Sequence, residues 1–162
     1  MKEETVIHPI PPVFDEHSRI LILGSFPSVK SRESAFFYGH PQNRFWRVLA
    51  TLFEDNVPGT VDEKRIFLLK KRIAVWDVIA KCRITGSADT TIREAEPNDL
   101  SSILSAAPIE KIFTNGGTAT ALYRRHIREK VGMDCIPLPS TSPANAACSL
   151  DGLLLAWRKI IQ

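Results

Sequence analysis

The stretch ILILGSFPSVKSRESAFFYGHPQNRFWR, residues 20–47, decides the fold. It begins with an apolar run, 20–23, that stops abruptly at Gly24. A short apolar run ended by glycine is typical of a buried strand, and open α/β sheets bind ligands at the carboxyl ends of their strands. The aromatic cluster and the His, Asn and Arg that follow suit a flat heterocycle beside a phosphate chain. The stretch therefore predicts a buried strand that leads into a site for nucleic-acid bases.

The same pattern recurs along the rest of the chain. Short apolar runs predict strands at residues 73–76, 109–114 and 135–138, and helices are predicted to begin near residues 43, 60, 98, 118 and 149. Thr60 and Glu63 match a capping box, and Ser149 can cap the last helix. Prolines make residues 1–18 an extended lead-in, and residues 82–97 read as polar and irregular. Because apolar strands alternate with helices, we expect an α/β fold, with a parallel sheet covered by helices on both faces, in a single domain over residues 1–162.

Composition narrows the class of protein. The chain has 162 residues, of which 44% are hydrophobic, and its 21 basic and 18 acidic residues leave a net charge of only +3. This balance allows a polyanionic partner without requiring one. The three cysteines, Cys82, Cys135 and Cys148, are far apart, which disfavours a disulfide framework or a structural metal site with its about four ligands. No signal peptide or membrane-spanning run is visible, so we expect a cytoplasmic protein.

Three loops carry the polar residues from which a site could be built. Gly24-Ser25-Phe26-Pro27-Ser28 could offer backbone N–H groups to an anion or a base edge. Residues 36–43 bring three aromatic rings, His40 and Asn43 together, and the Asn43 amide offers both a donor and an acceptor to a base. Residues 138–146, LPSTSPANA, could grip phosphates through hydroxyls and wedge small apolar groups into a base stack. Arg44 and its basic neighbours are candidates for phosphate contacts.

Ordinary structural roles are open for each of these features. The first loop is also explained as a plain turn, the rings as filling beneath a loop, and Asn43 as a helix cap. The basic run 124–128 is explained as the solvated face of a helix. The loop after the first strand lacks a carboxylate apart from Glu33, and no catalytic triad or metal-binding motif is visible.

Two separated motifs resemble the uracil-DNA glycosylase superfamily, and within it the hypoxanthine (deoxyinosine) DNA glycosylases. They are GSFPS at 24–28, which leads into YGHPQNRFW at 38–46, and LPSTSPANA at 138–146; TNGG at 114–117 agrees. The resemblance implies a three-layer α/β/α sandwich with a short central parallel sheet of about four strands. It also implies removal of a deaminated base from DNA without a metal or organic cofactor, leaving an abasic site. The expected substrate is hypoxanthine, or else xanthine or uracil, and a monomer is expected.

The resemblance assigns roles to individual positions. Asn43 is expected to act in catalysis by orienting water or holding the base. The expected base-binding residues are Gly24, Ser25, Phe26, Tyr38 and His40, with Tyr38 stacked on the base. The expected DNA-binding residues are Ser28, Arg44, Ser140, Thr141, Ser142, Pro143, Ala144 and Asn145. Phe26 stands where better-known members carry an Asp or Asn that handles water, and Ser140 where uracil-specific members carry a His.

Other functions remain open at this stage. A uracil or G·U/G·T mismatch glycosylase would share the fold, although the missing acid and His argue against efficient uracil excision. A non-catalytic protein that binds damaged DNA and an enzyme acting on free nucleosides are the remaining alternatives. Excision assays on inosine and uracil oligonucleotides, and turnover of free inosine, separate them.

Overall fold

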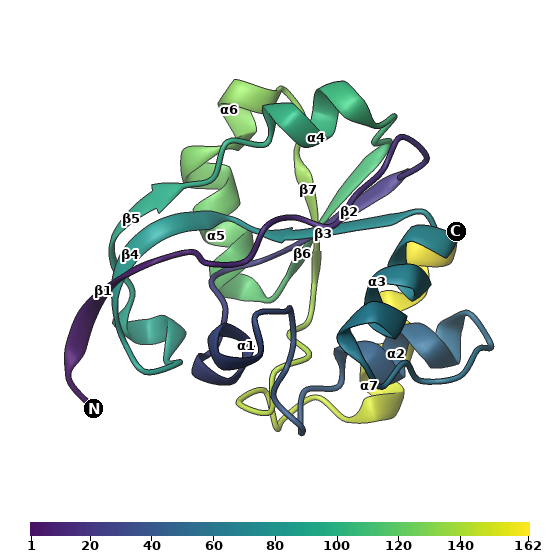
Figure 1. The fold of residues 1–162 in the computed structure, drawn as a ribbon, viewed down its shortest axis with the longest axis horizontal. Helices are drawn as coiled ribbons and strands as arrows, with labels where there is room; N and C mark the ends of the chain where they lie inside the picture. The colour runs from purple at the N-terminus through teal and green to yellow at the C-terminus, as the bar shows by residue number, and fades with distance from the viewer.

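A parallel sheet in the strand order β3–β2–β6–β7 forms the centre of the computed structural model, which describes residues 1–162 (Figure 1). The strands are β2 (Ile20–Gly24), β3 (Ile73–Asp77), β6 (Lys111–Asn115) and β7 (Cys135–Leu138). From β2 the chain first builds β3 on one side and later β6 on the other. The topology therefore reverses between β2 and β6, which is where ligands bind in sheets of this kind.

Helices cover both faces of this sheet. Helices α2 (Phe45–Leu52), α3 (Val61–Lys70) and α7 (Leu150–Trp157) lie together on one side, and α4 (Ser101–Ala106), α5 (Gly117–His126) and α6 (Arg128–Val131) lie away from them (Figure 1). A short helix, α1 (Val29–Ser34), follows β2, and 3-10 turns occupy 89–91 and 158–161. The expected α/β class and four-strand parallel sheet are confirmed.

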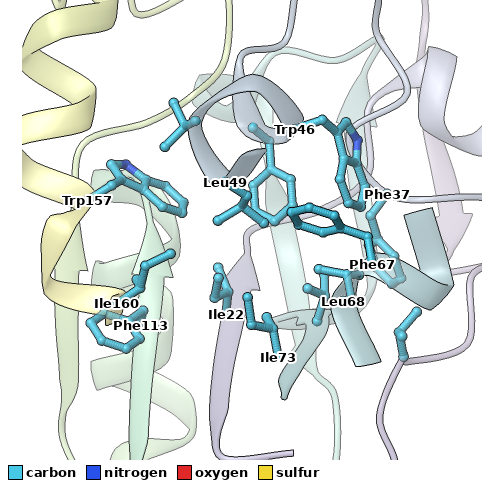
Figure 2. Packing of buried hydrophobic residues seen from close by; sticks show 14 of the residues in the cluster. Ile22, Phe37, Trp46, Leu49, Phe67, Leu68, Ile73, Phe113, Trp157 and Ile160 are labelled. Atoms are coloured by element: carbon cyan, nitrogen blue, oxygen red, sulfur yellow. The ribbon is translucent and has the colours of Figure 1, made fainter. Parts of the chain in front are cut away.

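The continuous apolar character of β2 follows from burial on both faces. Ile20 and Ile22 belong to the core beneath α2, α3 and α7, whereas Leu21 and Leu23 belong to the core beneath α4 and α5. In the first of these cores Ile22 lies among Leu49, Phe67 and Trp157, which come from the three covering helices (Figure 2). A strand that is covered on both faces has no solvent-facing positions for polar residues. This explains why residues 20–23 are all apolar.

A second, antiparallel sheet was not predicted. It consists of β1 (Glu3–Ile7), β4 (Ile79–Thr85) and β5 (Arg93–Pro97) in the order β1–β4–β5. The interpretation of residues 82–97 as irregular was therefore wrong. In β4, Cys82 and Ile84 are buried while Lys81 and Arg83 are exposed. The segment is therefore a half-buried strand, and its exposed charged residues led to the interpretation as a loop.

The remaining differences concern helix ends. The helix predicted to begin near residue 43 runs from Phe45 to Leu52, and the helix predicted to begin near residue 118 is divided at Ile127 into α5 and α6. The helix predicted to begin near residue 98 begins at Ser101, and the Asn98 side-chain amide donates to the backbone carbonyls of Asp77 and Ile79 instead of capping it. The caps at Thr60 and Ser149 are confirmed, since their hydroxyls accept from backbone N–H groups at 3.1 and 3.0 Å. No helix of the chain combines the length and the apolar character needed to cross a membrane.

Candidate active-site cleft

A cleft of about 970 Å³ opens at the carboxyl end of the central sheet. Gly24, Asp77 and Asn115 end β2, β3 and β6, Pro139 directly follows β7, and all four line the cleft. The cleft therefore includes the topological switch point between β2 and β6.

The two motifs singled out in the sequence meet across this cleft. Its lining includes, from the predicted site, Gly24, Ser25, Phe26, Ser28, Tyr38, His40, Asn43, Ser140, Thr141, Ser142, Pro143, Ala144 and Asn145. Arg44 is the one predicted site residue that does not line it. Loops that are about a hundred residues apart in the chain therefore form one concave surface.

Tyr38 is held rigidly at the cleft wall. Its ring stacks on Phe45 with centroids 4.0 Å apart and planes 18° apart, and its backbone carbonyl accepts from the Trp46 indole at 3.2 Å. The Tyr38 hydroxyl is the only buried side-chain polar atom without a hydrogen-bond partner. Burial, and after it the negative charge of Asp77, raises the pKa of Tyr38 above its ordinary value. The hydroxyl therefore keeps its proton and lies behind the cleft wall without a partner.

Asn43 combines a capping role with a free amide group. Its Oδ1 accepts from the backbone N–H of Phe45 at 3.0 Å, at the start of α2. Because the oxygen is engaged there, the amide NH2 is the part of Asn43 that can act in the cleft. Next to it, His40 accepts from the backbone N–H of Gln42 through Nδ1 at 3.1 Å, which fixes the turn before the helix.

Arg44 holds the second loop in place. Its guanidinium donates to the carbonyls of Ser142 at 3.4 Å and Asn145 at 3.0 Å, and also to that of Cys148. These bonds occupy donors that the sequence analysis had assigned to phosphate. In this structure Arg44 therefore acts on the loop rather than on the cleft directly.

Thr141 also has a supporting role. Its side chain is fully buried, and it exchanges two hydrogen bonds with Asn115, both of 3.0 Å. A buried hydroxyl cannot reach a phosphate, so the surface of this loop is provided by its neighbours. Ser140 and Ser142 are half-buried, and each accepts from a backbone N–H two residues ahead at 3.1 Å. Ala144 is the exposed residue at the tip.

Two carboxylates reach the cleft from elements that the sequence analysis passed over. Asp77, at the end of β3, is 3% exposed, and its Oδ2 accepts from His8 Nε2 at 2.7 Å. Asp89 is exposed as a residue, but its carboxyl group is partly buried and accepts from the Ser25 hydroxyl at 2.9 and 3.1 Å. Loss of surrounding water raises the pKa of Asp89, with a smaller contribution in the same direction from Asp77. The sequence did carry a signal for Asp77, because it is a polar residue at the end of an apolar strand.

Phe26 stands in the first motif as part of the hydrophobic support of the cleft. Only 8% of it is exposed, its ring meets the His8 ring edge-on at 5.8 Å, and the Arg32 guanidinium lies 5.7 Å from its centroid. A packed aromatic ring cannot activate water, so Phe26 cannot take part in acid–base chemistry.

Comparison with known proteins identifies the family. The family model described as the uracil DNA glycosylase superfamily matches residues 11–160. The chain belongs to this superfamily of DNA glycosylases, and the matched range includes both loops at the cleft.

Individual relatives agree with this assignment. The chain is 35% identical over 136 residues to a protein of Methanosarcina barkeri named hypoxanthine DNA glycosylase, and 36% identical to a protein of Methanosarcina acetivorans with the same name; each alignment covers 83% of this chain and 85% of the relative. A solution NMR structure of a candidate uracil DNA glycosylase from M. acetivorans superposes with a TM-score of 0.79. It shares 32% sequence identity and covers 97% of this chain and 100% of that one.

Proposed function

We propose that this protein is a monofunctional DNA glycosylase that removes hypoxanthine from DNA and leaves an abasic site. The observation that carries the proposal is that Tyr38 and Asn43, from one motif, line the same cleft as the 140–145 loop from the other. The two relatives named hypoxanthine DNA glycosylase support the choice of base. Xanthine and uracil, which also arise by deamination, are further substrates under this proposal.

The substrate base has to leave the duplex before it can enter the cleft. Unstacking costs a few kcal/mol, and the cost is lower for a mispaired deaminated base, which contributes to selection. In our proposal Pro143 and the exposed Ala144 enter the space that the base vacates, while Ser140 and Ser142 contact the flanking phosphates. The hydrogen bonds from Arg44 and Asn115 keep this loop in shape while it does so.

The chemical step requires little from titratable groups. The N-glycosidic bond breaks and its electron pair leaves with the base, while water adds to C1′ of the sugar. The proton that the water loses balances the proton that the departing base takes up. The free NH2 of Asn43 orients the water or holds the base, because a neutral amide cannot act as a general base. The backbone N–H groups of Ser25 and Phe26 make no hydrogen bond within the chain, and under our proposal they stabilise charge that develops on the departing base.

Labelled oligonucleotides that each carry one lesion test the proposal. Deoxyinosine, deoxyxanthosine and deoxyuridine are incubated with the protein in single- and double-stranded form, and abasic sites are then cleaved with alkali. We expect cleavage at deoxyinosine, and a loss of about 100-fold or more in Asn43→Ala with DNA binding retained. Gln42→Ala is the matched control, since Gln42 is an exposed neighbour outside the cleft. An unchanged rate in Asn43→Ala would remove Asn43 from the mechanism.

A uracil or mismatch glycosylase is the second candidate function. The related M. acetivorans structure described as a candidate uracil DNA glycosylase favours it. Faster cleavage at G·U or G·T than at deoxyinosine in the same assay would decide for this alternative. Tight binding of inosine DNA without release of any base would instead indicate a non-catalytic binding protein.

A further inference from the structure

A segment from the second sheet forms part of the rim of the cleft. Residues 87–90, in the connection between β4 and β5, line the cleft and are all exposed. Hydrogen bonds fix this connection to the segment that follows β2. The Ser87 hydroxyl accepts from the backbone N–H of Val29 at 2.9 Å, and the Gly86 carbonyl accepts from the Arg32 guanidinium at 3.3 Å. The antiparallel sheet therefore supplies a firmly held rim to a cleft that lies on the parallel sheet.

Asp89 is the ionisable residue of this rim. Its two carboxylate oxygens accept from the Ser25 hydroxyl at 2.9 and 3.1 Å, and no other hydrogen bond within the chain reaches them. A carboxylate offers about four acceptor positions, whereas one hydroxyl supplies a single hydrogen. The carboxylate is thus held in place by the first motif and retains acceptor positions for a water molecule in the cleft.

The two carboxylates of the cleft lie at different depths. Asp77, at the end of β3, is 3% exposed and accepts from His8, whereas Asp89 belongs to the exposed rim. A base that flips out of DNA stays attached to its sugar, and the sugar stays in the DNA backbone. The sugar carbon C1′ therefore remains near the mouth of the cleft. Asp89 is the carboxylate at the level where water attacks this carbon.

The surroundings of Asp89 make it a stronger base than an ordinary aspartate. Burial raises the pKa of its carboxyl group, the negative charge of Asp77 acts in the same direction, and the hydrogen bond from Ser25 opposes the rise. A general base becomes more effective as its pKa approaches the pH at which it works. A carboxylate that is partly deprived of water and still has free acceptor positions in a cleft is typical of functional sites.

Few other ionisable groups face this carboxylate. Tyr38 and Cys82 lie close enough for the charge of Asp89 to act on them, although burial is the main cause of their raised pKa values. Arg32 places a positive charge on the Cys82 side. Asp77 and His40 are the remaining ionisable groups that line the cleft. Because all of these are unchanged in a variant of Asp89, a comparison with the unmodified protein isolates the titration of Asp89.

Resting on the proposed function, we propose that Asp89 is the catalytic base that takes up the proton of the attacking water. The water oxygen bonds to C1′ while the N-glycosidic bond breaks and its electron pair leaves with the base. One O–H bond of the water breaks, and its proton passes to Asp89 and from there to solvent, which supplies the proton that the departing base takes up. The negative charge also stabilises the positive charge that develops on the sugar. Ser25 is a positioning residue, because its hydroxyl holds the carboxylate.

The variant Asp89→Asn tests the proposal, because its amide oxygen can still accept from Ser25 while a neutral amide cannot take up a proton. We expect single-turnover release of hypoxanthine from an inosine duplex near pH 7 to fall by about 100-fold or more. In the unmodified protein the rate should fall as the pH is lowered through the raised pKa of Asp89, and this acid limb should be absent from the variant. Glu94→Gln is the matched control, an exposed carboxylate of the same sheet outside the cleft. It should keep both the rate and the acid limb.

A second variant leaves Asp89 in place and moves its titration. Ser25→Ala removes the hydrogen bond that lowers the pKa of Asp89, so the acid limb should move to higher pH. A purely structural role for Asp89 would lower the rate by the same factor at every pH and would not move the limb. Release by Asp89→Asn within about threefold of the unmodified protein, an acid limb that persists in Asp89→Asn, or an unmoved limb in Ser25→Ala would each overturn the inference.

Failure of the proposed function is visible separately, in the unmodified protein. If that protein released uracil and no hypoxanthine, the choice of base would be wrong. The comparison of Asp89→Asn with the unmodified protein would then be made on a uracil duplex with the same expected results, because water attacks C1′ whichever base departs.

Discussion

Replacing Asn115 by alanine should both destabilise the protein and loosen the loop that faces DNA. The Asn115 side chain makes two buried hydrogen bonds, one from the backbone N–H of Thr141 and one to its hydroxyl oxygen. A buried group left without its partner costs about 1–3 kcal/mol, and the second bond contributes about 1 kcal/mol. We therefore expect a loss of about 2–4 kcal/mol in the free energy of unfolding, which corresponds to a fall of about 4–16 °C in Tm.

Urea denaturation measures this loss, and a double-mutant cycle assigns it. Thr141→Val removes one of the two bonds and should cost about 1 kcal/mol, and combining it with Asn115→Ala should be less than additive. Asn56→Ala is the control, because Asn56 is exposed and its side chain forms no hydrogen bond; it should change stability by less than about 0.5 kcal/mol. A loss below about 0.5 kcal/mol for Asn115→Ala, or strict additivity with Thr141→Val, would refute the reasoning.

Three other substitutions probe the cleft and its support. Gly24→Ala would place a methyl group 2.4 Å from Asp77 Oδ1, so it should cost about 1–3 kcal/mol by overpacking, and excision assays should show a larger loss of rate than unfolding alone explains. Trp157→Phe removes the 2.9 Å bond from the indole to the Pro139 carbonyl and part of a fully buried side chain, so urea denaturation should show a loss of about 1.5–3 kcal/mol. Asp89→Asn should be more stable than the unmodified protein at pH 7, because the raised pKa of Asp89 means that its charged form is disfavoured in the folded state. Folding stability from this group is present below its unfolded pKa and lost as the pH rises, so the difference in Tm should shrink toward pH 3.

The main sheet and its helices could be predicted because their signals are local. Residues 20–23 form a continuous apolar run ended by glycine, and Thr60 and Ser149 carry hydroxyls at the positions where helices begin. The second sheet could not be predicted in this way. Strand β5 has the sequence Arg-Glu-Ala-Glu-Pro, which has almost no preference for a strand by itself. It forms a strand because its backbone pairs with β4. This pairing depends on the tertiary structure and not on the residues of β5 alone.

The candidate site also has a part that could be predicted from local sequence and a part that could not. The two loops could be predicted from their motifs, but the roles within them depend on partners distant in sequence. Arg44 bonds to carbonyls 98 to 104 residues away, and His8 meets Asp77 across 69 residues. Asp77 could have been noticed by the rule that selected Gly24, since it also ends an apolar strand. His8 had no such signal, because its importance arises only from the strand pairing that brings it to the sheet.

The most direct test of the proposed activity is to count the products of one reaction. A duplex with a single deoxyinosine is incubated with excess protein, and mass spectrometry identifies and counts the free base while alkali counts the abasic sites. We expect free hypoxanthine and abasic sites in equal amounts, rising together with time. Strand breaks without free hypoxanthine, or stable binding without either product, would contradict the account.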